Sequence, residues 1–160
     1  MNKYHLNLKI PVKFDFPSYQ IPNKDFHYHT RFHKSDMTDE FKQWIYSLGL
    51  SIMTGEFFYT PPHRTLEPHS DSQVLDDVVK LNWMQGGEGS VMDWYELKEG
   101  FNLRSKQTSI NTYYTYAPMI ALDRIHTATV GFPSLVNVGR IHGIRNRSKP
   151  RYVACVVLNN

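Results

Sequence analysis

The pattern of hydrophobic and polar positions changes character at Gly49. Before it, hydrophobic residues alternate with polar ones over positions 3–14, and Pro11 and Pro17 interrupt the alternation. A period of two that is broken by prolines predicts one or two short strands. The first part of the chain is therefore expected to add strands to a structure built mainly by the residues after Gly49.

A single helix is predicted between Thr38 and Leu48. Thr38 is a capping residue, and Asp39 and Glu40 supply acids for the first turn. Hydrophobic residues then recur with helical spacing, and Gly49 ends the pattern. These residues are Phe41, Trp44, Ile45 and Leu48. A stripe of this kind is typical of packing against a core.

After Gly49 the chain consists of short hydrophobic or alternating segments separated by Gly, Pro, Asn and Asp. This pattern predicts an antiparallel sandwich or barrel. Strands are expected near residues 50–59, 67–72, 78–84, 89–97, 112–117, 128–132, 135–144 and 151–158. We interpret residues 85–89 as a glycine-rich hairpin turn, because no Gly-Lys-Ser/Thr and no helix come after it as a phosphate loop would require.

Composition places the chain among ordinary globular proteins. It has 160 residues, of which 41% are hydrophobic and 21% charged, with a formal net charge of +3. Its hydrophobic runs are far shorter than the roughly 20 residues that cross a bilayer, and the first residues lack a signal-peptide pattern. Cys155 is the only cysteine, so no intramolecular disulfide can form. We therefore expect one domain in a reducing, intracellular, cytoplasmic setting, with no membrane contact.

The strongest candidate chemistry lies in residues 67–72. Alternate side chains of an extended strand share a face, so His69 and Asp71 would present an imidazole and a carboxylate side by side. By itself such a pair is also common in a solvated turn. His142, from a distant predicted strand, would complete a set of two histidines and one carboxylate. Such a set leaves coordination positions open on a non-haem Fe(II) for a cosubstrate and dioxygen.

Arg151 comes after His142, at the start of the last predicted strand. An arginine at the buried end of a strand, beside a metal, can bind a carboxylate through two parallel hydrogen bonds. It could hold the far end of a dicarboxylic cosubstrate whose other end chelates the iron. This adds a cosubstrate site to the predicted metal site.

The order of His69-x-Asp71, a long sheet-forming stretch, His142 and Arg151 resembles that of the Fe(II)- and 2-oxoglutarate-dependent oxygenases. The resemblance runs from about residue 50 to the C-terminus, and further local matches are residues 80–83 and 93–95. Within the superfamily the chain looks most like small oxygenases related to prolyl hydroxylases and aspartyl/asparaginyl β-hydroxylases, some of them carried by phages. The second of these branches often lacks the metal carboxylate, so Asp71 favours the general hydroxylase pattern.

The resemblance implies a mainly β fold, the double-stranded β-helix, which is a jelly-roll or cupin-like barrel. Residues 1–160 would form a single oxygenase domain, with N-terminal strands and a buttressing helix in residues 1–49 and the β-helix core in residues 50–160. The reaction would use dioxygen to decarboxylate 2-oxoglutarate to succinate and to hydroxylate an unactivated C–H bond. The substrate would be a peptide side chain, an amino acid or a small metabolite.

The resemblance also assigns roles to individual residues. His69, Asp71 and His142 would hold Fe(II) and carry catalysis. Arg151 would bind 2-oxoglutarate, and the candidates for further contacts with cosubstrate or substrate are Asn82 and Tyr95. The loops expected around the mouth of the barrel are residues 19–37, 59–65 and 99–112.

Other histidines receive structural interpretations. We interpret His27, His29 and His33 as surface or packing residues, because their segment resembles a loop and no acid lies between the first two. His63 follows two prolines and is expected near the mouth of the site, whereas His126 has no companion motif. Both are expected to be structural or substrate-facing rather than metal ligands.

Two alternatives to the hydroxylase stay open. A run of basic residues at 140–151 and the tyrosines at 113–116 could serve a nucleobase-directed oxygenase, although a net charge of +3 is weak for a nucleic-acid partner. A cupin or jelly-roll module could also bind a ligand without catalysis. No pattern in the chain indicates an oligomeric state.

Overall fold

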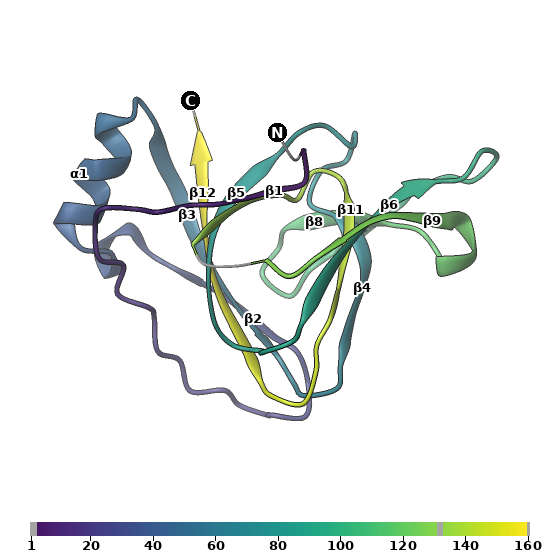
Figure 1. The fold of residues 1–160 in the computed structure, drawn as a ribbon, viewed down its shortest axis with the longest axis horizontal. Helices are drawn as coiled ribbons and strands as arrows, with labels where there is room; N and C mark the ends of the chain where they lie inside the picture. Colours follow the sequence, from purple (N-terminus) through teal and green to yellow (C-terminus); the bar gives the residue numbers. More distant parts are fainter. Residues whose placement is uncertain (1–2, 131–132, 160) are drawn as a thin grey trace.

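The computed structural model describes residues 3–130 and 133–159. Nearly half of these residues lie in two six-stranded antiparallel sheets that face one another (Figure 1). The first sheet contains, in spatial order, β1 (His5–Asn7), β10 (Ser134–Asn137), β5 (Val79–Gly86), β12 (Arg151–Asn159), β3 (Ser51–Thr60) and β2 (Tyr28–Phe32). The second contains β7 (Arg104–Gln107), β8 (Tyr113–Tyr116), β4 (Thr65–Ser70), β11 (Ile141–Arg145), β6 (Val91–Leu97) and β9 (Leu122–Ala128).

The strand order is that of a double-stranded β-helix. Strands β3 to β6 alternate between the sheets, and β9 to β12 cross back between them in the complementary positions. The result is a four-stranded core in each sheet, β10-β5-β12-β3 and β4-β11-β6-β9. Strands β1 and β2 extend the first core, and β7 and β8 extend the second. The predicted jelly-roll fold is confirmed by this topology.

The predicted helix is confirmed as α1 (Asp39–Ser47). The Thr38 hydroxyl accepts a hydrogen bond from the Phe41 backbone N–H at 3.2 Å, which satisfies one of the free donors of the first turn. Phe41 and Ile45 are completely buried, in one hydrophobic cluster with Phe57 of β3. The helix therefore covers the outer face of the first sheet (Figure 1). Two short 3-10 helices, Lys34–Asp36 and Met119–Ala121, complete the described helical structure.

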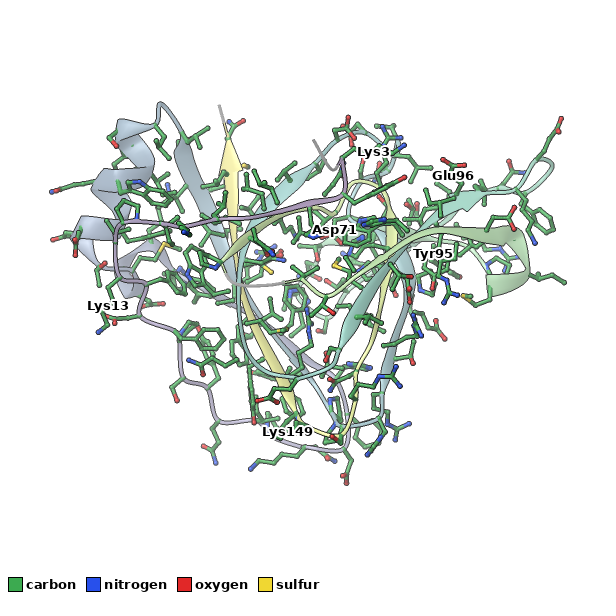
Figure 2. All side chains as sticks on the ribbon, viewed as in Figure 1. Lys3, Lys13, Asp71, Tyr95, Glu96 and Lys149 are labelled. Carbon is green, nitrogen blue, oxygen red and sulfur yellow. The ribbon has the colours of Figure 1, made fainter. Side chains whose placement is uncertain are left out.

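Residues of the first sheet alternate between this outer cluster and the interior. Phe57 and Val156 belong to the cluster under the helix. Their neighbours Glu56 and Cys155, which are paired across β3 and β12, point to the other side and line a cavity between the sheets. Figure 2 shows Asp71 between the sheets, and Lys13 and Lys149 at the periphery. The interior thus receives charged side chains as well as hydrophobic ones.

The glycine-rich segment 85–89 is a turn, but the prediction that it closes a hairpin is wrong. Strands β5 and β6 belong to different sheets, so the turn carries the chain from one sheet to the other. Gly86 and Gly87 both have a φ of 66°, and a Cβ on Gly86 would lie 2.3 Å from the Pro150 carbonyl oxygen. Close contact with the β11–β12 turn therefore requires glycine there.

The remaining differences concern the limits of strands. The segment 135–144 divides into β10 and β11, and the alternation over 3–14 gives only the three residues of β1. The strand expected at 128–132 is displaced toward the N-terminus as β9, and its positions 131–132 lie outside the described residues. Strands β2 and β7 were not predicted. No helix in the described residues is long and hydrophobic enough to span a membrane.

Candidate metal centre

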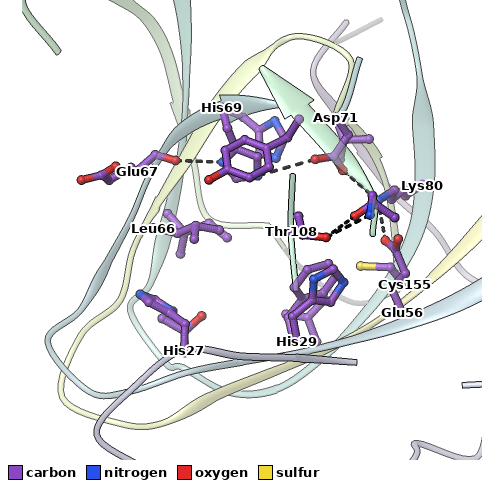
Figure 3. Close-up of a pocket in the computed structure, with 18 of the residues that line it drawn as sticks. His27, His29, Glu56, Leu66, Glu67, His69, Asp71, Lys80, Thr108 and Cys155 are labelled. Carbon is purple, nitrogen blue, oxygen red and sulfur yellow. Dashed lines mark hydrogen bonds and ion pairs between the residues drawn. The ribbon is translucent and has the colours of Figure 1, made fainter. Parts of the chain in front are cut away.

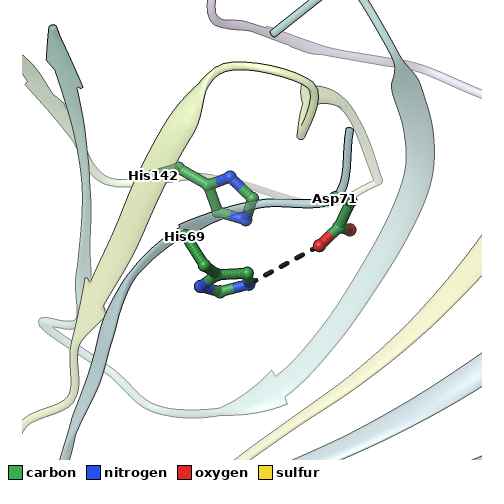
Figure 4. A group of neighbouring side chains, drawn as sticks. All are labelled: His69, Asp71 and His142. Atoms are coloured by element: carbon green, nitrogen blue, oxygen red, sulfur yellow. Dashed lines mark ion pairs between the residues drawn. The ribbon is translucent and has the colours of Figure 1, made fainter. Parts of the chain in front are cut away.

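The structure brings His69, Asp71 and His142 together inside the barrel (Figure 4). His69 lies on β4 directly opposite His142 on β11, and residues paired across antiparallel strands point to the same face. Their ring centroids are 4.5 Å apart. Asp71 comes immediately after β4, and one ligand atom from each of the three residues lies within 4.8 Å of the others. These atoms are close enough to bind one ion.

Backbone carbonyls orient both imidazoles. His69 Nδ1 lies 2.8 Å from the Glu67 carbonyl oxygen, and His142 Nδ1 lies 2.9 Å from the Arg140 carbonyl oxygen. Because a carbonyl oxygen only accepts hydrogen bonds, each Nδ1 carries a proton, and in the neutral form of each ring the lone pair lies on Nε2. His69 Nε2 lies 3.6 Å from Asp71 Oδ1. Outer hydrogen bonds of this kind are typical of metal-binding histidines.

The charge states suit a divalent cation. Burial, together with the neighbouring His69, lowers the pKa of His142 to about 4, so this ring is neutral at neutral pH. Burial alone would raise the pKa of Asp71, but the ammonium group of Lys80 holds it well below its usual range. A neutral imidazole and an ionised carboxylate are the forms that bind metals.

Hydrogen bonds fix the loop that carries Asp71. The Asp71 backbone N–H donates to the Val138 carbonyl at 2.9 Å, and the Ser70 hydroxyl donates to the Gly139 carbonyl at 2.6 Å. A Cβ on Gly139 would lie 1.9 Å from the Asp76 carbonyl oxygen, so only glycine allows the two loops to approach this closely. These contacts hold the loop of Asp71 against the turn at 138–140, which leads into β11, the strand of His142.

A cavity of about 1000 Å³ extends from these three residues across the interior (Figure 3). Both sheets line it, and it includes Arg151, Asn82 and Cys155 of the first sheet. Tyr114 of β8 stands edge-on to His69, with 5.5 Å between the ring centroids. The cavity is large enough for a small organic ligand.

Arg151 is buried in the wall of this cavity, with 7% of its surface exposed. Its Nε donates to Met84 Sδ at 3.0 Å, and no carboxylate in the described part of the chain lies within ion-pair distance of it. Burial lowers the pKa of Arg151 to about 10, so the group is still charged at neutral pH. A buried cation without a counter-ion is costly, and an anionic group in the cavity would offset that cost.

The two weaker candidates have different positions. Asn82 lines the cavity, and its buried Oδ1 has no hydrogen-bond partner among the described residues. Tyr95 is not brought to the cavity. It pairs with Ile141 rather than with His142, which directs it to the opposite face of the second sheet, in a cluster with Ala117 and Leu122. Figure 2 labels it on this outer side.

Two of the other histidines also reach the cavity. The prediction of a loop at 27–33 is wrong, because β2 pairs with β3 and places His27 and His29 along the cavity wall. His29 stacks on Phe58 at 4.1 Å, and burial lowers the pKa of His29 to about 4. His33 lies at the start of the first 3-10 helix, His63 lies in a turn, and His126 stacks on Tyr4. These three histidines are not among the residues that line the cavity.

Lys80 and Glu56 belong to the site but were not predicted from the sequence. Lys80 Nζ lies 2.7 Å from Asp71 Oδ2 and 2.5 Å from Glu56 Oε2, and the Lys80 and Glu56 side chains are almost completely buried. The signal in the sequence was a charged residue within each hydrophobic strand, at a position that alternation directs inward. Lys80 even begins one of the segments that match the oxygenases, but no role was assigned to it.

Comparisons with known proteins find only distant structural similarity. No family model and no curated protein matches the chain. Among solved structures it is similar to an oxalate oxidase in complex with the substrate analogue glycolate, with a TM-score of 0.36, 13% identity, and coverage of 86% of this chain and 52% of that one. It is also similar to Peruvianin-I, a cysteine peptidase from Thevetia peruviana latex, with a TM-score of 0.34, 13% identity, and coverage of 82% and 61%.

The chain spans about half the length of the oxalate oxidase. Superpositions of this quality carry no argument about function, and the assignment of the fold rests on the strand order. The strand order and the cluster of ligand atoms together define a jelly-roll protein with a candidate metal centre of two histidines and one carboxylate.

Proposed function

We propose that the protein is an Fe(II)- and 2-oxoglutarate-dependent oxygenase that hydroxylates an unactivated C–H bond while 2-oxoglutarate is decarboxylated to succinate. The observation that supports this proposal is the shared cavity. The metal-ligand set of His69, Asp71 and His142 and the buried, unpaired Arg151 line the same interior space. Three ligands on one side and an anion-binding group farther along the wall match the requirements of a chelating dicarboxylic cosubstrate.

Each of these residues would have a distinct task. The Nε2 atoms of His69 and His142 and Oδ1 of Asp71 would hold the metal, since these atoms face one another. Bound iron would supply the activation of dioxygen. Arg151 would bind the far carboxylate of 2-oxoglutarate, and the free Oδ1 of Asn82 would accept a hydrogen bond from a group bound beside it. The two sheets that enclose the cavity would limit the access of bulk water to the site.

The open side of the cavity would receive the substrate. Its walls there include Lys106 of β7, Tyr114 and Tyr116 of β8, and Arg31 of β2. A peptide side chain, an amino acid or a small metabolite would fit in the space that the cosubstrate leaves. In this proposal the core of residues 50–160 provides the metal ligands and the cosubstrate site, within one domain.

Anaerobic titration with Fe(II) and 2-oxoglutarate tests the proposal. Chelation of a 2-oxo acid by Fe(II) produces a visible charge-transfer band. We expect the band in the wild type, its loss in His69→Ala, and a need for far more 2-oxoglutarate in Arg151→Ala. Arg147→Ala is the matched control, because Arg147 is exposed on the turn that precedes Arg151. The absence of a band in a folded wild-type protein would refute the proposal.

A binding module without catalysis is the second candidate. It is favoured by the ion pair between Lys80 and Asp71, which neutralises the partly buried carboxylate of Asp71 without any metal. For this alternative we expect no change in the melting temperature when Fe(II) or Mn(II) is added. A stabilisation that depends on His69 would exclude it, because a ligand that binds only the folded state raises its stability.

A further inference from the structure

Two ion pairs that share Lys80 lie directly behind the candidate metal site (Figure 3). Lys80 comes from β5 and Glu56 from β3, and both point into the interior of the barrel. The ammonium group of Lys80 lies between the carboxylates of Glu56 and Asp71, 2.5 Å from one and 2.7 Å from the other. Lys80 of the first sheet thus holds the carboxylate of Asp71, although Asp71 comes directly after β4 of the second sheet.

The two oxygens of Asp71 have different surroundings. Oδ1 faces His69 Nε2 at 3.6 Å, on the side of the candidate ligands. Oδ2 accepts a hydrogen bond from Lys80. A carboxylate that is held at one oxygen cannot rotate freely, so Oδ1 stays directed toward the other ligands. With Oδ2 occupied, a metal in this site would bind Asp71 through a single oxygen.

Glu56 makes this arrangement rigid. A lysine side chain is long and flexible, and holding its end in one place costs conformational entropy. The Glu56 carboxylate restricts Lys80 Nζ from a second direction, and the exposed fractions of the Lys80 and Glu56 side chains are only 9% and 7%. Desolvation in this position is unfavourable unless each charge keeps its partners. Removal of either partner would therefore affect the other.

We propose that Lys80, fixed by Glu56, is a positioning residue that orients Asp71 for binding a metal through one oxygen and keeps its second oxygen away from the metal. This inference rests on the proposed metal site. Lys80 belongs to the first sheet, whereas the three candidate ligands belong to the second sheet and the loop after β4. The first sheet would therefore help to set the positions of ligands that the second sheet carries. A coordination position that a second carboxylate oxygen would occupy is thereby left open for other ligands.

The test must separate orientation from charge. Lys80, Glu56 and Asp71 together carry one excess negative charge, and the double variant Glu56→Gln/Lys80→Met leaves that total unchanged. The attraction of the cluster for a cation is therefore preserved while the restraint on Asp71 is removed. Lys80→Arg is the second variant. It also preserves the charge, but the planar guanidinium cannot reproduce the two contacts of an ammonium group.

Co(II) titration measures the effect, with the intensity of the visible bands as a report of coordination geometry. We expect the dissociation constant to rise by about 10–100-fold in both variants, the usual cost of losing a group that orients a ligand. The cobalt spectrum should also change. Lys9→Met is the control, since Lys9 is exposed, does not line the cavity and has no ion pair among the described residues.

The outcomes distinguish this inference from the proposed function. A wild-type protein that binds no Co(II) would refute the metal site and, with it, the role of Lys80. A wild type that binds Co(II), together with a folded variant of unchanged affinity and spectrum, would refute only the positioning role. The melting temperature of each metal-free variant shows whether that variant is folded. If the double variant does not fold, Lys80→Arg alone tests the positioning role.

Discussion

The buried carboxylate of Asp93 on β6 allows a quantitative test of how the second sheet is stabilised. Its side chain is completely buried, and it accepts hydrogen bonds from Arg145 Nε at 2.5 Å and Arg145 Nη2 at 2.9 Å. The Thr127 hydroxyl donates to it at 2.5 Å. Asp93→Asn preserves the volume of the side chain but removes the charge that Arg145 faces.

The loss of unfolding free energy expected for Asp93→Asn depends on how deeply the ion pair with Arg145 is buried. Breaking a fully buried ion pair costs about 3–5 kcal/mol, but the Arg145 side chain is 40% exposed, so water can solvate part of its charge. We therefore expect Asp93→Asn to lower the free energy of unfolding by about 2–3 kcal/mol. For a protein of this size the melting temperature should fall by roughly 5–10 °C.

Thermal and urea unfolding measure the change, with Asp123→Asn as the control. Asp123 lies on the neighbouring strand β9, but its ion pair with Lys98 is exposed, so little change is expected. Burial would raise the pKa of Asp93, but the bonds from Arg145 and Thr127 outweigh it and lower the pKa. Its contribution is thus complete above the pKa of the unfolded state and is lost as the pH falls through the lower folded value. A variant that melts like the wild type at pH 7 would refute this reasoning.

Two further predictions concern the first sheet. Burial raises the pKa of the Cys155 thiol to about 12, so little of the reactive thiolate exists at pH 8. We expect Cys155 to react with a disulfide reagent at pH 8 more than about 100-fold more slowly in the native protein than in urea. Equal reaction rates in the two conditions would contradict the buried position of Cys155. Phe41→Ala removes a completely buried ring between α1 and the sheet and should lower the free energy of unfolding by about 3–5 kcal/mol. Urea denaturation measures it, with the exposed Tyr46→Ala as the control; equal effects of the two changes would show that the helix face is misassigned.

Local signals in the sequence were sufficient for the helix and for most strands of the core. Thr38 and Gly49 mark the two ends of the helix in chain order, and these signals depend only on neighbouring residues. The proximity of His69, Asp71 and His142 was also predictable, since two of them alternate on one predicted strand and the third lies on a later one.

Features that depend on pairing between distant segments were not predictable in this way. All four residues of β7 are exposed, so the strand lacks the alternation that marks a half-buried strand, and β2 exists through its pairing with β3. A glycine-rich turn has the same local chemistry whether the next strand returns to the same sheet or crosses to the other one.

Within the site, the face of the sheet to which a side chain points was the feature that the sequence predicted least well. Tyr95 lies one residue after Trp94, and that single step directs it away from the side of His142. The role of Lys80 does not follow from its residue type, because a lysine is usually solvated, and only the three-dimensional structure shows two carboxylates around it.

The position of β12 has a consequence for the order in which this molecule can be assembled. It is the last described strand, yet it lies in the middle of the first sheet, where it separates β3 from β5. Until it is inserted, both neighbours expose unpaired backbone edges that can join with those of other chains. Such dependence on distant contacts predicts slow folding, and nascent chains that end before Arg151 should aggregate readily.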